Sequence, residues 1–349
     1  MFIKSVIQNK NKRRKTMKKI LSAILLVALL LTSVAALASC GGSKLKMGLG
    51  VYTATPTATD ATADAAGAGK VAITVAAVLV DESGKIVKCV IDTAENTVSY
   101  TNDGKAVAAT EFKTKYEKGD DYNMVEYGGS EKEWYQQVDA FCALTVGKTA
   151  DEVMALVVND DKGTDEVISA GCTITVSEFA KAVKKAVENA TDSQATKNSE
   201  LKLGVDTEQA NKDATADAAG SSQLDTTVFA AAVGSDGKIV DCATECVRVK
   251  FTFDVEGKST FDTTKEIKGK RELGTGYGMS AYGQDLNGDG TVKEWFEQAD
   301  AFEAACVGKT ADKVEELLAS DGYGVESLQT AGCTIAIGGL VRAAAKLAD

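Results

Sequence analysis

Two decapeptides show how this chain is organised: Lys132–Phe141 (KEWYQQVDAF) and Lys293–Phe302 (KEWFEQADAF). They differ at three positions and lie 161 residues apart. Val146–Asp151 (VGKTAD) and Ala170–Ile174 (AGCTI) recur at the same offset, whereas Asp60–Gly67 (DATADAAG) recurs unchanged after 153 residues. The chain therefore contains two copies of one domain sequence, and the second copy has eight extra residues.

The repeat also predicts the domain boundaries. The first copy spans about residues 44–190 and the second about 200–349. At about 145 residues, each copy has the size of an ordinary domain rather than of a solenoid unit. The polar stretch Ala190–Glu200 between the copies is typical of a linker.

Each copy begins with a β-rich part. In the first copy, Val71–Val80 and Ile86–Asp92 are rich in strand formers, and Asp81–Lys85 (DESGK) between them has the composition of a hairpin turn. A further β-rich stretch, Thr173–Val176, comes near the end of the copy. We expect these segments to form an antiparallel sheet.

Helical patterns lie between and after the β-rich segments. Trp134, Val138 and Phe141 share the spacing of one face of an amphipathic helix. Thr149–Glu152 has the pattern of a capping box, and a last helix is predicted from about Ser177 to Val187. The sequence predicts an α+β protein of two homologous domains, each an antiparallel sheet with packed helices.

The N-terminus has the features of an export signal. Eight basic and no acidic residues lie within residues 1–39, and Ile20–Ala38 is an uncharged, apolar run. The next cysteine, in Leu37-Ala38-Ser39-Cys40, has the setting of a bacterial lipoprotein signal. Residues 1–39 are therefore predicted to be a signal peptide, and Cys40 to carry lipid that anchors an extracytoplasmic protein to the bacterial cell membrane. An uncleaved transmembrane helix is the alternative.

Composition excludes several classes of function. The chain holds 39 Lys and Arg, 50 Asp and Glu, and no His, which excludes Ser-His-Asp catalysis and histidine-ligated metal sites. Its net charge of −11 becomes −19 without the eight basic N-terminal residues, so no nucleic-acid partner is expected. No nucleophile has a recognisable base. A carrier or binding protein is therefore expected rather than an enzyme.

The turn Ala170–Thr175 (AGCTIT) directly precedes the last predicted helix of the first copy. Together with the β-rich segments and Gly84–Val87 (GKIV), it resembles the FMN-binding domain of extracytoplasmic flavoproteins. That family includes lipoproteins with tandem flavin domains, and its members often carry FMN on a threonine through a phosphoester. Its pattern is roughly Asp-x-x-Ser/Thr-Gly-Ala-Thr, and the Gly and the last Thr of it are present in both copies.

The resemblance implies an FMN-binding lipoprotein that passes electrons to a redox partner in the envelope. Gly171, Thr173 and Thr175 would bind the cofactor in the first copy, and Gly332 and Thr334 in the second. Hydroxyls next to a helix N-terminus also suit a phosphate on physical grounds, and two hydroxyls favour the first copy. The alternatives are a turn of small residues that packs strand to helix, and a cofactor-free lipoprotein that binds a ligand or an envelope partner.

Two further motifs have an open interpretation. Glu117–Met124 and Glu272–Met279 share the pattern Glu-x-Gly-x-x-Tyr-x-Met, which suits either a pocket wall or the edge of the core. Asp285, Asn287 and Asp289 have the spacing of the start of a calcium loop, for which a polar turn is the alternative.

The cysteines do not form a recognisable framework. If Cys40 is lipidated, seven remain, so at least one has no partner within the chain. Cys242 and Cys246 would lie about 13 Å apart on one extended strand, too far for a disulfide. We expect mostly free, buried thiols.

Overall fold

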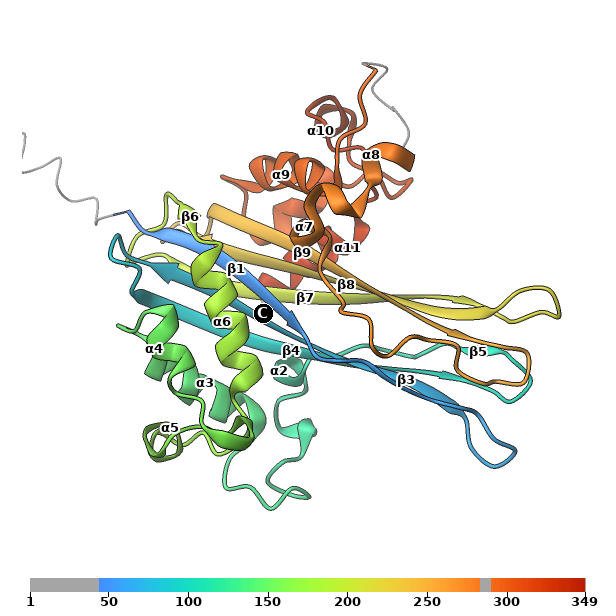
Figure 1. Ribbon diagram of the computed structural model, residues 1–349. Helices are drawn as coiled ribbons and strands as arrows, with labels where there is room; N and C mark the ends of the chain where they lie inside the picture. Colours follow the sequence, from blue (N-terminus) through green and yellow to red (C-terminus); the bar gives the residue numbers. More distant parts are fainter. Residues whose placement is uncertain (1–43, 283–289, 349) are drawn as a thin grey trace, which may run out of the picture. The chain divides into compact units, whose positions relative to one another are not determined.

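The computed structural model describes residues 44–282 and 290–348, and Lys44–Asp349 forms one compact unit (Figure 1). The predicted signal peptide and Cys40 lie outside the described residues, as do Asp285, Asn287 and Asp289 of the predicted calcium loop. Two antiparallel sheets with packed helices confirm the predicted α+β fold.

The first copy forms the larger sheet. Its strands are β1 (Lys46–Thr53), β2 (Thr57–Thr59), β3 (Gly67–Val80), β4 (Ile86–Tyr100), β5 (Ala106–Val107) and β6 (Thr191–Asp192), in the order β5-β4-β3-β1-β6, with β2 on β3. The predicted hairpin joins β3 and β4. Its turn is held by Asp81, whose carboxylate accepts the amides of Ser83 and Lys85, while Gly84 adopts a φ of +77°.

The helices of the first copy follow the sheet. They are α2 (Lys115–Lys118), α3 (Trp134–Thr145), α4 (Ala150–Met154), α5 (Asp165–Ala170) and α6 (Ser177–Glu188), with 3₁₀ turns η1 (Gly119–Tyr122) and η2 (Asn159–Asp161). The predicted stripe of α3 is buried, the Thr149 capping box opens α4, and α6 matches the last predicted helix. The prediction of a strand over Thr173–Val176 is wrong, because within it Thr175 alone pairs, as an isolated bridge to Lys162.

The second copy repeats this plan. Its sheet has the order β7-β8-β9, with β7 (Glu200–Lys212), β8 (Gly220–Val233) and β9 (Ile239–Phe253). Its helices are α7 (Lys270–Leu273), α8 (Met279–Tyr282), α9 (Trp295–Cys306), α10 (Glu326–Thr330) and α11 (Gly338–Ala345), with 3₁₀ turns η3 (Gly274–Tyr277), η4 (Ala311–Leu317) and η5 (Lys346–Ala348). Lys313 stands where the capping box needs an acid, and there the chain forms η4 instead of an α-helix.

The stretch predicted to be a linker is part of the fold. Thr191 and Asp192 form β6 against the start of β1, and the Leu45 amide donates to the Ala195 carbonyl at 2.9 Å. Ala195 is fully buried. The connection between the copies is therefore packed rather than loose.

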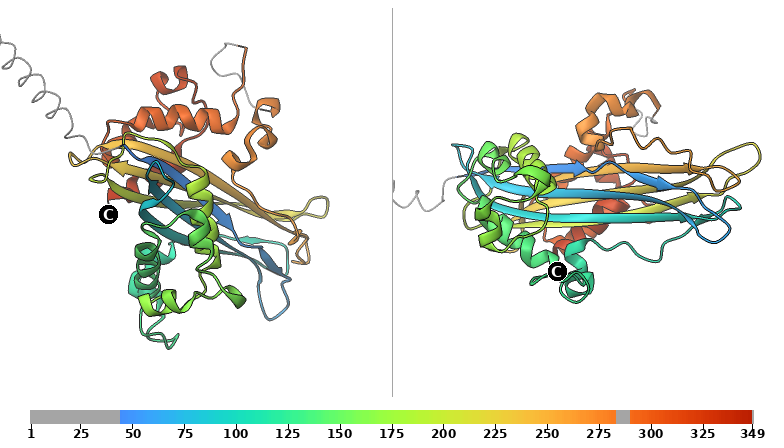
Figure 2. Two further views of the ribbon diagram at one scale, coloured as in Figure 1. Left: turned by 60° about the vertical axis from the view of Figure 1, so that its left-hand side comes forward. Right: turned by 60° about the horizontal axis from the view of Figure 1, so that its bottom comes forward.

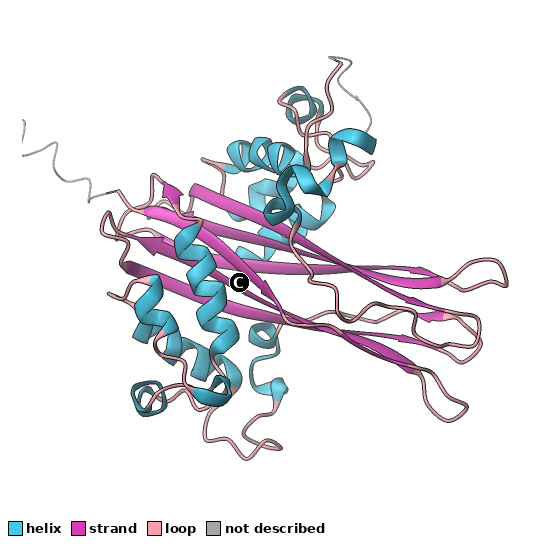
Figure 3. Cartoon of the chain, in the orientation of Figure 1, coloured by secondary structure: helices cyan, strands magenta, loops and turns pink. Residues whose placement is uncertain are grey.

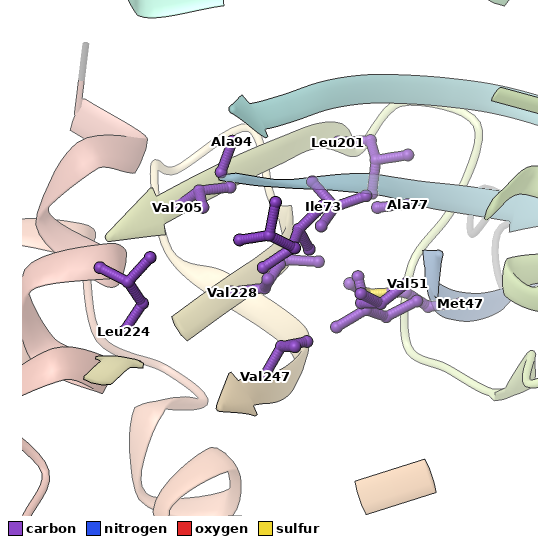
Figure 4. Packing of buried hydrophobic residues seen from close by; sticks show 14 of the residues in the cluster. Met47, Val51, Ile73, Ala77, Ala94, Leu201, Val205, Leu224, Val228 and Val247 are labelled. Atoms are coloured by element: carbon purple, nitrogen blue, oxygen red, sulfur yellow. The ribbon is translucent and has the colours of Figure 1, made fainter. Parts of the chain in front are cut away.

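The two sheets pack face to face. In β3, Val71, Ile73 and Val75 point to the opposite sheet, whereas Ala76 and Val78 pack against helices of their own copy. Figure 4 shows the core between the sheets, and Figures 1, 2 and 3 show the helices of the two copies outside the strands. The layers therefore run helices, sheet, sheet, helices. Burial on both faces explains the continuous apolar runs of the central strands.

The unchanged DATADAAG segment lies where the far ends of the long strands meet. Asp60 accepts the Ser259 amide of the other copy at 2.8 Å, and its counterpart Asp213 accepts the Ala106 amide at 2.9 Å. Two backbone hydrogen bonds of 2.8 Å are reciprocal in the same way. The Ala61 amide donates to the Gly257 carbonyl, and the Ala214 amide donates to the Gly104 carbonyl. The identical sequence is thus used twice in one reciprocal contact.

Tyr100 and Phe253 occupy equivalent positions in the two copies, and they contact each other. Their rings stack with centroids 4.4 Å apart and planes inclined by 10°. Both side chains are fully buried. A stacked pair of equivalent residues marks a local two-fold relation, so the copies pack as the subunits of a symmetric dimer do.

Candidate functional site

The Ala-Gly-Cys-Thr-Ile turn has the same structure in both copies. Gly171 ends α5 with a φ of +100°, and Gly332 follows α10 with a φ of +101°. A Cβ on either glycine would collide with a lysine ammonium, that of Lys132 or of Lys293. Glycine is therefore required by the left-handed backbone, whereas the end of the flexible lysine side chain can move aside.

A buried glutamine holds the threonine that follows. Gln137 Oε1 accepts the Thr173 amide at 2.8 Å and its hydroxyl at 3.0 Å. Gln298 Oε1 accepts the Thr334 amide at 2.8 Å and hydroxyl at 2.9 Å. Both donors of each threonine therefore have an acceptor inside the protein, and the turn ties the chain ahead of the last helix to α3 or α9.

Thr175 lies beyond this clamp, on the surface. It is exposed and borders a small cleft in the first copy, together with Ile174. The helices that follow the two turns, α6 and α11, have no side-chain cap at their N-termini. Their first-turn amides therefore have no acceptor within the helix.

Each copy has a cleft between the outer face of its sheet and its helices. The cleft of the second copy has a volume of about 430 Å³ and that of the first about 200 Å³. Ligand pockets usually have about 300–1,000 Å³, so the second is within that range and the first below it. Residues shared by the two linings are Tyr122, Met124, Trp134 and Ile174, and in the second copy Tyr277, Met279, Trp295 and Ile335.

The shared Tyr-x-Met motif therefore lines a cleft in both copies. A lysine that the sequence analysis did not select completes the wall. Lys115 Nζ lies 5.2 Å from the ring centre of Tyr122, and Lys270 Nζ lies 5.6 Å from that of Tyr277 and 5.7 Å from that of Trp295. Both lysines stand seven residues before the tyrosine, a signal that the repeat alignment contained.

One substitution removes a side chain from the second cleft. Glu178 in α6 reaches into the cleft of the first copy, where the Thr74 hydroxyl donates to it at 3.2 Å. Its counterpart is Gly339 in α11, and a Cβ there would lie 2.9 Å from the hydroxyl of Thr227, the counterpart of Thr74. The second copy therefore lacks the side chain that fills the first cleft.

Charges in the larger cleft are paired on one side. Asp225 accepts hydrogen bonds from Arg248 at 2.8 and 3.1 Å, and Lys270 Nζ lies 3.6 Å from it. Burial raises the pKa of Asp225, but the Arg248 hydrogen bond and the Lys270 charge outweigh it, so that the pKa is lowered. Asp225 stays ionised and holds two cations on the wall. Lys270 is only 8% exposed.

Two further acids have unusual surroundings. Burial raises the pKa of Glu303 on α9 to about 7, although the charge of Arg271, 2.6 Å away, lowers it. Burial likewise raises the pKa of Asp92 on β4 to about 6, against hydrogen bonds from Thr114 and nearby amides. These groups border cavities of about 820 and 490 Å³ beside the sheets.

Within residues 44–282 and 290–348, no group of three or more Cys, Asp or Glu side chains is placed to hold a metal ion. No helix in the same described ranges is long and apolar enough to cross a bilayer. No family model, curated protein or solved structure matches the chain. Its function is therefore argued from the clefts and the sequence motifs.

Proposed function

We propose that this chain is a lipid-anchored, extracytoplasmic binding protein whose second copy holds a small ligand in its outer cleft. The observation that carries the proposal is the exchange of Glu178 for Gly339 between two clefts that share a tyrosine, a methionine and a tryptophan. It leaves a 430 Å³ space walled by an aromatic ring, a thioether and a buried lysine. The lining also includes charged and polar side chains, among them Asp225 and Arg248, so the cleft offers a ligand both apolar surface and polar groups.

FMN is the ligand that the resemblance implies, and several features suit it. Trp295 and Tyr277 offer flat apolar surface for a ring. Lys270, Arg248 and the first-turn amides of α11 offer cationic and donor groups for a phosphate. Bound there, FMN would supply reversible electron transfer, for which an envelope redox partner is needed.

The threonine clamp favours non-covalent binding over a phosphoester. The Thr334 hydroxyl donates to Gln298, so it would have to leave that acceptor to become a nucleophile. The same holds for Thr173 and Gln137 in the first copy. This observation also favours the second candidate function, a cofactor-free lipoprotein that binds another ligand in the same cleft.

The deciding experiment uses the full-length protein purified in detergent from its own envelope. We expect flavin absorbance bands in the purified protein, or FMN uptake in equilibrium dialysis. Gly339→Glu should weaken FMN binding roughly tenfold or more, since it restores the side chain that fills the first cleft. Gly338→Glu is the matched control, because Gly338 does not line the cleft.

The outcomes separate the candidates. If riboflavin binds as tightly as FMN, the proposed phosphate contacts are wrong. No flavin bands and no FMN uptake would exclude the flavin and leave the cofactor-free candidate. An intact-mass gain of one FMN after co-expression with a flavin transferase, lost in Thr334→Ala, would overturn non-covalent binding.

The anchor is tested separately. Cys40→Ser should prevent lipidation and release the protein from the membrane fraction, because the thioether needs the cysteine sulfur. If Cys40→Ser stays membrane-bound at the mature size, the lipid-anchor proposal is wrong.

A further inference from the structure

Four of the seven described cysteines form two pairs, each between a strand and a helix. Cys89 on β4 and Cys142 on α3 lie in one core cluster and border the same cavity. Cys242 on β9 and Cys306 on α9 share another cluster, where the Cys242 thiol donates to the Glu303 carbonyl of α9 at 3.4 Å, about one turn from Cys306. All are thiols in this structure. The other three, Cys172, Cys246 and Cys333, are also buried, and Cys246 and Cys333 lie in the same core cluster as Cys242 and Cys306.

The two pairs use different positions of the helix. Cys89 and Cys242 are equivalent, but Cys142 corresponds to Glu303, and Cys306 lies three residues further on. Three residues are about one turn, so both helix cysteines lie on the face that meets the strand. Each copy thus has a helix cysteine next to its strand cysteine, although the two helix cysteines are not at equivalent positions of the repeat.

Backbone hydrogen bonds join the segment that follows each helix to the start of its strand, three residues before the strand cysteine. Gly147 donates to the Ile86 carbonyl at 2.7 Å, and Ile86 donates to the Lys148 carbonyl at 2.9 Å. In the second copy the corresponding bonds join Ile239 to Gly308 and Lys309, both at 2.8 Å. The end of each helix is therefore fixed to the strand that carries its partner cysteine.

We propose that Cys89–Cys142 and Cys242–Cys306 are dithiol sites that close to two disulfides in the extracytoplasmic protein. The oxidant is a disulfide. The thiolate of one cysteine attacks a sulfur of the oxidant, forming a mixed disulfide and releasing one thiolate. The partner cysteine then attacks this mixed disulfide and releases the second. Each cysteine gives up one proton, and two electrons pass to the sulfurs of the oxidant.

The order of closure follows from exposure. Cys89 is half-buried, whereas Cys142, Cys242 and Cys306 are buried. The neighbouring Cys89 thiol, together with burial, raises the pKa of the Cys142 thiol well above its ordinary value. Cys89 is therefore the attacking residue of its pair, and the first copy closes before the second.

The test uses the folded, full-length protein in detergent, reduced and then treated with oxidised glutathione. Remaining thiols are alkylated after unfolding at successive times, and the peptides are mapped by mass spectrometry. We expect two thiols to be lost first, as the Cys89–Cys142 disulfide forms, and two more later, as the Cys242–Cys306 disulfide forms. The Tm should rise by several degrees, because each bridge constrains the unfolded chain.

Single variants keep the outcome clear. Cys142→Ser should leave a glutathione adduct on Cys89 and an intact Cys242–Cys306 bridge, and Cys306→Ser should spare Cys89–Cys142. Cys172→Ser and Cys333→Ser are controls that should keep both bridges. Bridges to Cys172, Cys246 or Cys333, stable glutathione on Cys89 of the unaltered protein, or seven persisting thiols would each overturn the proposal.

Discussion

Gln137 and Gln298 are the residues on which the repeated turn depends. Each is nearly fully buried, accepts two hydrogen bonds from a threonine and donates to the carbonyl of Lys132 or Lys293. Without the glutamine, these donors and the carbonyl lose their partners in a partly buried turn. Unsatisfied buried groups cost about 1–3 kcal/mol each.

We therefore expect Gln298→Leu to lower the free energy of unfolding by roughly 2–3 kcal/mol. Thr334→Val, which removes the hydroxyl but keeps the amide, should cost about 1 kcal/mol. Urea denaturation followed by circular dichroism measures both. Equal, negligible losses would contradict the structural role of the clamp.

Glu303 makes stability depend on pH. Its ordinary pKa of 4.5 rises to about 7 in the folded protein, so the native state holds this proton more tightly than the unfolded chain. The contribution to the free energy of unfolding therefore falls as pH rises from about 4.5 to about 7. The fall is roughly 3 kcal/mol at most.

Glu303→Gln should abolish this fall, so that the variant gains stability relative to the unaltered protein between pH 4.5 and pH 8. Asp300→Asn is the control, because it removes the exposed partner of the same Arg271 guanidinium and leaves the slope in place. Denaturation curves across this pH range give the slopes. Parallel slopes for the unaltered protein and Glu303→Gln would exclude the residue as its source.

At the scale of elements, the start of α6 and of α11 sets the size of the two outer clefts. Glu178→Gly should open the first cleft, and the number of bound ligands should rise from one to two per chain. Thr74 keeps a partner in Thr93, 3.1 Å away, so the sheet is not left with an unpaired hydroxyl. Isothermal titration with FMN measures the stoichiometry.

A matched variant identifies the new site. Adding Lys115→Met to Glu178→Gly should return the stoichiometry to one, because it removes the cation over Tyr122 and Trp134. A stoichiometry of one in Glu178→Gly itself would show that this side chain does not control access.

The elements themselves were largely predictable, because local patterns encode them. The Asp81–Lys85 turn and the buried stripe of Trp134, Val138 and Phe141 follow from spacing alone. The element that covers each face of β3 cannot be predicted from spacing, since a strand that is apolar on both sides has the same sequence pattern whether it packs against a sheet or a helix. Thr173–Val176 has strand composition, but the Gln137 clamp holds it as a turn.

The cleft was predictable only in part. The repeated Tyr and Met suggested a wall, and they line one. The repeat alignment marks Lys115 and Lys270 as equivalent, but the effect of Lys270 and Gly339 depends on residues that the fold brings near them. Only a comparison of the two copies, position by position, distinguishes Glu178 from Gly339.

At the scale of the whole molecule, the reciprocal contacts make each copy a suitable partner for itself. We expect residues 44–199 expressed alone to form a symmetric dimer, because the inner face of their sheet is apolar and Asp60 can accept the Ala106 amide of a second chain, as Asp213 does in this chain. Light scattering after size exclusion measures the mass. A folded monomer, shown by native-like circular dichroism, would contradict this expectation.

The chain contains two tryptophans, and the fold gives one to each copy at the same place, Trp134 and Trp295. Each is nearly buried beside the lysine of its own cleft. The molecule therefore carries a built-in optical reporter in each half. Replacing Trp134 by Phe leaves emission from the second half alone, and the converse change isolates the first. Local events in either half become visible without any added label.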